Sequence, residues 1–138
     1  MMYTPEKNAM ILLLSSEPVV RAVIKEVLEG AGYVVLATGG LGTAAELLAE
    51  YPIDLLVTHP YIDNVPGHAA AKYLRTQKPG LAVLVIAGLL EDDRLQNRAD
   101  LEGFDLFPAA FTAAQLLEKV AEVLEAARKR ETAHAGQA

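Results

Sequence analysis

Two polar dipeptides at the ends of apolar runs hold the side chains of this chain that could do chemistry. Ser15 and Ser16 follow the run AMILLL, and Thr58 and His59 follow the run IDLLV. Short runs rich in leucine and valine are typical of strands buried on both faces of a parallel sheet. In such sheets, ligands bind just beyond the carboxyl ends of the strands. We therefore expect these hydroxyl groups and the imidazole to lie together in one crevice.

The rest of the chain supplies the elements that would position this crevice. Apolar segments predicted as strands alternate with helical patterns, which implies parallel strands joined by right-handed crossovers, with helices on both faces. The expected strands are residues 9–14, 33–37, 53–58, 81–87 and 104–108. The fold class is predicted to be α/β and flavodoxin-like, a doubly wound five-stranded parallel sheet of order 2-1-3-4-5. Its switch point lies between the first and third strands.

Capping residues set the expected ends of the helices. Ser16 and Thr43 are predicted to cap the first two helices. Thr112 is predicted to cap the last helix, which runs to about Arg130. A weak polar helix is expected over residues 94–100, and residues 59–66 are expected to form a long loop.

The first helix is predicted to be amphipathic. Its charged residues Arg21, Lys25, Glu26 and Glu29 are expected to face water, and its apolar residues to pack on the sheet. The apolar positions are Val19, Val20, Val23, Ile24, Val27 and Leu28.

Composition favours a single globular domain without nucleic-acid chemistry. The 138 residues are 52% hydrophobic and 22% charged, with a net charge of −6 and no cysteine. The absence of cysteine excludes thiolate metal sites. The negative net charge is not that of a typical nucleic-acid binder, which carries a basic surface. No apolar run is long enough for a bilayer or a signal peptide, so a cytoplasmic protein is expected. Residues 1–8 are predicted to be a flexible N-terminus, 9–130 the domain, and 131–138 a disordered tail or the start of a linker.

Local sequence patterns resemble a known family over roughly residues 9–127. The stretches ILLLSSEP, EGAGYVV, ELLAEYPIDLLV and PGLAVLVIA look like the receiver domain of two-component response regulators. Receivers of this family catalyse their own phosphorylation on an aspartate, with Mg²⁺ held by that aspartate and an acidic pair. A hydroxyl residue and a lysine contact the phosphoryl group.

The resemblance also shows what stands at those positions here. The acidic pair falls on Ser15 and Ser16, the phospho-acceptor on His59, the hydroxyl on Ala87, the lysine on Ala109, and the switch aromatic on Leu106. Serine and alanine offer neither carboxylate ligands for a hard cation nor a positive charge for phosphoryl oxygens. The resemblance therefore implies a degenerate receiver that is not an enzyme and binds no Mg²⁺ or other cofactor.

His59 leaves alternatives open. It could accept a phosphoryl group in a phosphorelay, bind a metal, or act as a pH switch. It could also be a polar space-filler that hydrogen-bonds Ser15 or Ser16. Neither His68 nor His134 stands at a recognisable metal-ligand spacing from it.

Other candidate motifs have simpler explanations. Asp63 could offer a stray carboxylate to a cation, but Asp63-Asn64 is better explained as loop-shaping. Glu17 is explained as the start of a helix. The glycines Gly39, Gly40 and Gly42 lack the lysine of a phosphate loop. Ser15-Ser16 lacks the context of a hydrolase nucleophile.

These patterns predict a protein-interaction module in signalling. The expected face combines the fourth helix, fifth strand and fifth helix, and a homodimer remains open. Its candidate residues are Leu89, Leu90, Gln115, Glu118, Lys119 and Glu122. The alternative functions are a phosphorelay acceptor using His59 and a small-ligand sensor using the emptied crevice. The chain would be either a stand-alone adaptor or a fragment of a longer regulator.

Overall fold

The central sheet has the strand order that the sequence predicts. The computed structural model of the chain describes residues 9–59, 61–62, 65–86, 105–107 and 112–136. Parallel strands form a five-stranded sheet in the order β2-β1-β3-β6-β7, which are the predicted second, first, third, fourth and fifth strands. The strands are β1 (Met10–Leu14), β2 (Val34–Thr38), β3 (Leu55–Thr58), β6 (Ala82–Ile86) and β7 (Asp105–Phe107). The α/β flavodoxin-like prediction is confirmed.

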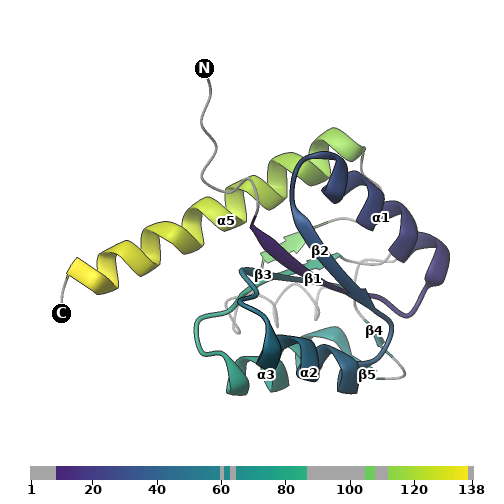
Figure 1. Cartoon of the computed structure of the whole chain (residues 1–138), viewed down its shortest axis with the longest axis horizontal. Coiled ribbons are helices and arrows are strands. Elements are labelled where there is room, and N and C mark those ends of the chain that lie inside the picture. The colour runs from purple at the N-terminus through teal and green to yellow at the C-terminus, as the bar shows by residue number, and fades with distance from the viewer. Residues whose placement is uncertain (1–8, 60, 63–64, 87–104, 108–111, 137–138) are drawn as a thin grey trace.

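Helices cover both faces of this sheet, as predicted (Figure 1). They are α1 (Pro18–Gly30), α2 (Leu41–Glu50), α3 (Gly67–Gln77) and α5 (Ala113–Gly136). Helices α1 and α5 lie on one face, and α2 and α3 lie on the other. In the described parts of the chain, no helix is both long enough and apolar enough to cross a membrane.

The two cores follow from the alternation of side chains along each strand. In β1, Leu12 and Leu14 pack toward α2 and α3, whereas Ile11 and Leu13 pack toward α1 and α5. Every residue of β3 is buried, including its last residue, Thr58. Because helices cover the sheet on both sides, its middle strands can be apolar throughout.

Several local details differ from the predictions. Residues 59–66 contain a small antiparallel pair, β4 (Tyr61–Ile62) with β5 (Val65–Pro66), where a plain loop was expected. Helix α2 begins at Leu41 with Gly40 at its N-cap, so Thr43 lies inside the helix and does not cap it. Helix α5 continues to Gly136, so the expected end at Arg130 is wrong, and the predicted domain boundary falls inside this helix. The helix predicted over 94–100 lies outside the described residues.

Candidate functional site

The candidate site is the carboxyl edge of the sheet, which we define as the last residues of β1, β2 and β3 and the residues that follow them. Leu14, the last residue of β1, pairs with Thr38 of β2 and Thr58 of β3 in the parallel ladders. Ser15 directly follows β1, and His59 directly follows β3. The strand register therefore brings these two residues to neighbouring positions, as the switch-point argument predicts.

The hydroxyl groups at this edge are engaged with the local backbone. Ser15 and Thr58 are fully buried. Ser15 Oγ accepts the backbone N–H of Glu17 at 3.3 Å. Thr58 Oγ1 donates to the backbone oxygen of His59 at 3.3 Å. These bonds hold the ends of the two strands in shape, which is an ordinary role for Ser and Thr beside a turn.

The predicted cap of α1 by Ser16 is wrong. The N-cap residue is Glu17, with Pro18 in the first turn, and no side chain caps the helix. Ser16 is exposed, and it is Ser15 that accepts the Glu17 N–H. The chain turns one residue later than expected because the buried β1 ladder continues through Ser15, whose N–H donates to Thr38 O at 3.0 Å.

His59 lies partly buried just beyond β3. Its Nδ1 atom is buried and, within the described residues, has no hydrogen-bond partner. The expected hydrogen bond to Ser15 or Ser16 is therefore not present at this nitrogen. Burial lowers the pKa of the imidazole from its ordinary value of 6.5, and the Glu17 carboxylate opposes this shift. Lowering the pKa favours the neutral imidazole, because charging a desolvated ring without a partner is costly.

Arg21 is a residue of the edge that the sequence argument missed. Its Nη1 donates to the backbone oxygen of Ser15 at 2.6 Å, although it was predicted to face water. Arg21 precedes the buried Ile24 by three residues, so the two share one side of the helix. Val19 and Val23 fall on another side and are 76% and 55% exposed, against the prediction that they pack on the sheet.

Some predicted site residues cannot be placed. Ala87, Ala109, Leu89, Leu90, Asp63 and Asn64 lie outside the described residues. Leu106 is the middle residue of β7 and pairs with Val85 of β6. On α5, Gln115 takes part in the N-terminal cap with Thr112, Lys119 pairs with Glu122 at 3.3 Å, and Glu118 is exposed. Lys119 is thus less free than predicted, with a side chain only 22% exposed.

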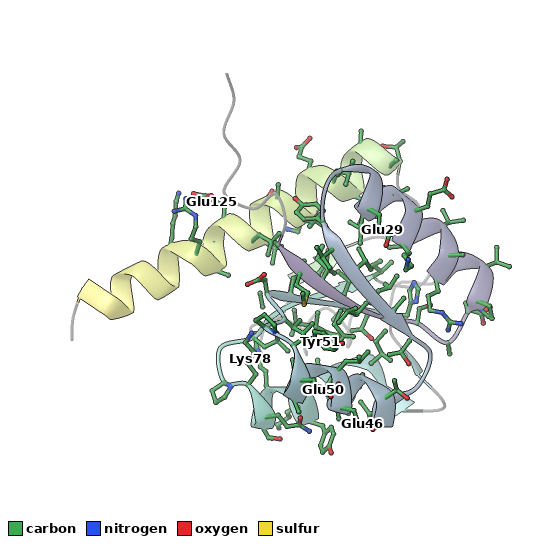
Figure 2. The ribbon with its side chains drawn as sticks, in the orientation of Figure 1. Glu29, Glu46, Glu50, Tyr51, Lys78 and Glu125 are labelled. Atoms are coloured by element: carbon green, nitrogen blue, oxygen red, sulfur yellow. The ribbon has the colours of Figure 1, made fainter. Side chains whose placement is uncertain are left out.

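The described part of the carboxyl edge offers few ligands that suit a divalent cation. No group of three or more His, Cys, Asp or Glu side chains in the described parts of the chain could hold a metal ion. Exposed carboxylates such as Glu29 on α1 and Glu46 and Glu50 on α2 stand on helices that cover opposite faces of the sheet (Figure 2). Mg²⁺ prefers carboxylate oxygens, and the edge presents hydroxyls that already serve the backbone.

A family model decides what this architecture is. The response regulator receiver domain matches residues 11–121 of the chain. The chain belongs to the response regulator receiver family. Receivers are signalling domains of two-component systems, and they act through partner proteins. The resemblance noted in the sequence is therefore correct at the level of the family.

Solved receivers share the fold at low sequence identity. A CheY-like receiver domain protein from Methanospirillum hungatei JF-1 is 18% identical, covers 88% of this chain and 98% of its own, and has a TM-score of 0.80. NtrX from Brucella abortus, solved with ATP, is 22% identical over 91% of this chain and 29% of its own, with a TM-score of 0.83. These likenesses show the fold.

A curated relative is a much longer protein than this chain. The sensor kinase CckA from Brucella abortus (strain 2308) is 27% identical over 120 residues, which is 86% of this chain and 13% of the kinase. The present chain thus matches only a small part of that relative's length.

Proposed function

We propose that this receiver is degenerate and signals by binding a protein partner without being phosphorylated. The observation that carries the proposal is the makeup of the carboxyl edge, where Ser15, Ser16 and His59 occupy the positions that the family resemblance gives to carboxylates. Under this proposal the chain binds no Mg²⁺, has no enzymatic activity, and works in the cytoplasm as an interaction module.

The chemistry of the edge supports this proposal. A Mg²⁺ ion needs hard, charged oxygen ligands, and phosphoryl transfer needs donors and cations around the phosphoryl oxygens. Ser15 is neutral, fully buried and already bonded to the Glu17 N–H. By residue type alone, Ala87 and Ala109 bring a methyl group where the family resemblance expects a hydroxyl and a lysine.

His59 defines the alternative proposal, an unconventional phosphoryl acceptor. A neutral imidazole is a competent nucleophile, and burial keeps the pKa of His59 low. Against this role, its Nδ1 is buried without a hydrogen-bond partner among the described residues, and the charged group that shifts its pKa is the Glu17 carboxylate, not a cation. A phosphoryl group there would lack the charge stabilisation that such transfers require.

Phosphorylation can be tested directly. The protein is incubated with Mg²⁺ and acetyl phosphate, and separately with Mg²⁺ and beryllofluoride, and is followed by intact mass and amide NMR. We expect no added phosphate and no saturable shift at the amides of Ser15, Ser16 or His59. Added phosphate that disappears in His59→Ala would establish the alternative and overturn the proposal. Phosphate retained in that variant would also overturn the proposal and place the acceptor elsewhere.

Two surfaces of the domain are candidates for binding the partner protein. The sequence favours the face that includes Leu89, Leu90 and α5. The structure adds a second surface on α1, where Val19, Val20 and Val23 are 76%, 41% and 55% exposed. Exposed valines one helical turn apart form a continuous apolar strip, and such strips on soluble domains often mark protein interfaces.

Charge substitutions can separate these faces. Partner binding is compared for Val19→Asp/Val23→Asp and for Leu89→Asp/Leu90→Asp, with Val34→Asp, a 42% exposed valine on β2, as the matched control. We expect one pair to abolish binding of a given partner and the control to leave it intact. Undiminished binding to both paired variants would show that neither face carries the interaction.

A further inference from the structure

Arg21 and Gly39 make a close contact across the carboxyl edge. Arg21 lies on α1 and donates from Nη1 to Ser15 O at 2.6 Å. A Cβ atom placed on Gly39, which follows β2, would lie 2.6 Å from Arg21 Nη1 and 3.4 Å from Ser15 O. The guanidinium therefore sits directly against the Gly39 backbone, over the place where β1 and β2 end.

The feature of Gly39 that matters here is the space left by its missing side chain, not an unusual backbone conformation. Positive φ angles, which also favour glycine, occur at Gly32 and Gly80 among the described glycines, and Gly39 is not one of them. Its backbone would accept another residue, and because the atom that a Cβ would meet is the end of a flexible side chain, the guanidinium would have to move aside. A Cβ approach under 3.0 Å forces a neighbour to move. Gly39 therefore leaves room for the guanidinium in its present place.

The contact joins two loops that start helices. Ser15 N donates to Thr38 O at 3.0 Å, and Gly40 N donates to Thr38 Oγ1 at 3.3 Å. The Arg21 guanidinium adds a bond from α1 to the Ser15 oxygen, on the β1 side of this link. A hydrogen bond from a charged donor is about twice as strong as a neutral one. The loop from β1 to α1 and the loop from β2 to α2 are thus linked by the Ser15–Thr38 hydrogen bond, and the Arg21 guanidinium lies beside that link, close to Gly39.

The charge of Arg21 is not neutralised by a described side chain. No carboxylate in the described part of the chain forms an ion pair with it. A guanidinium stays protonated at any physiological pH and carries several donors. The edge therefore contains a permanent positive charge next to Ser15, the position to which the family resemblance assigns a metal-binding carboxylate.

We propose that Arg21 is a built-in cation that fixes the β1–α1 and β2–α2 loops in one geometry without a metal ion, and that Gly39 provides the space for it. This inference deepens the proposed function and rests on it. A receiver whose site is held in one geometry by Arg21 would present the same surface to its partner at all times. In this proposal Arg21 holds the loops of the site in place, and Gly39 leaves the space that the Arg21 guanidinium occupies.

Amide hydrogen exchange tests the tie. In Arg21→Ala we expect exchange at Ser15 and Gly40 to rise about tenfold, the effect of losing one charged hydrogen bond. Gly39→Ala should produce a similar rise, because its Cβ displaces the guanidinium. The double variant should exchange no faster than either single variant, since both changes remove the same contact. Lys25→Ala, which removes an exposed ion pair with Glu29 on the same helix, is the control and should leave both amides unchanged.

Chemical rescue tests the cation itself. Guanidinium chloride added at low concentration to Arg21→Ala should restore protection at Ser15, and an equal concentration of sodium chloride should not. The rescue should fail in Arg21→Ala/Gly39→Ala, where a methyl group fills the space. Unchanged exchange in Arg21→Ala, additive effects in the double variant, or equal rescue by both salts would each overturn the inference. Phosphorylation of the wild-type chain would overturn the proposed function. It would not decide whether Arg21 holds the loops, which the exchange results test independently.

Discussion

Thr112 and Gln115 cap each other at the start of α5. The Thr112 N–H donates to Gln115 Oε1 at 2.9 Å, and the Gln115 N–H donates to Thr112 Oγ1 at 3.1 Å. This reciprocal pair satisfies two backbone donors at once and is a capping box. The prediction that Thr112 caps the last helix is confirmed, and Gln115, chosen from the sequence as an interface residue, also has a structural task.

The capping box gives a first prediction. Thr112→Ala should lower the free energy of unfolding by about 1 kcal/mol, because it leaves the Gln115 N–H without its acceptor. Thr43→Ala is the matched control, since Thr43 lies inside α2 and Gly40 is the N-cap there. It should change stability by less than about 0.5 kcal/mol. Urea denaturation measures both, and equal losses would contradict the assignment of the caps.

The pH dependence of stability gives a second prediction. The pKa of His59 is lowered in the folded state, so the unfolded chain binds the proton more tightly. Stability from this group is therefore complete above pH 6.5 and is lost as the pH falls from there through the lowered folded pKa. His59→Gln cannot titrate, so it should lose less stability than the wild type on acidification.

Glu17 provides a check on the same group. Its carboxylate raises the pKa of His59 against the effect of burial, so Glu17→Gln should lower that pKa further. NMR titration of the imidazole in both proteins measures the shift. The pH prediction for His59 has its own contradicting outcome. It would be contradicted if the stability of the wild type and of His59→Gln fell equally between about pH 7.5 and about pH 5, which lie about one unit or more either side of the ordinary histidine pKa.

Alanine substitutions of Leu56 and Val19 should differ in their effect on stability, because Leu56 lies in the core and Val19 on the exposed side of α1. Leu56 is fully buried in β3, the middle strand of the sheet. Leu56→Ala should cost about 2–5 kcal/mol, because it leaves a cavity between strands and helices. Val19→Ala should cost less than about 0.5 kcal/mol, since Val19 is 76% exposed. A large loss for Val19→Ala in thermal unfolding would show that this residue packs on the core after all.

The sequence predicted the frame of the site better than its contents. Alternating apolar segments determine the strand order, and the order alone brings Ser15 and His59 to neighbouring positions. Arg21 could not be found this way, because its role depends on the reach of a long side chain past the end of β1. Its place three residues before Ile24 was the available signal. Thr43 shows the same limit, since the backbone turn at Gly40 decides where α2 begins.

The small strands β4 and β5 were missed for another reason. Each has two residues, and two residues carry no periodicity that a sequence could reveal. Val19 and Val23 are apolar but lie on a different side of α1 from the buried Ile24, so their residue type alone predicted the wrong environment. Helical spacing around Ile24 and Leu28, the buried positions, would have separated Val19 from them.

Asp54 closes the ladder between β1 and β3 at the end opposite the site. Its N–H donates to Met10 O at 2.8 Å, and its Oδ2 accepts the Met10 N–H at 2.8 Å. Asp54→Ala should lower the free energy of unfolding by about 0.5–1 kcal/mol, because the Met10 N–H then has only water as a partner. Asp54→Asn keeps an acceptor oxygen and should lose less. Urea denaturation distinguishes the two, and an equal loss would mean that the charge of Asp54, rather than its hydrogen bond, supports the start of the sheet.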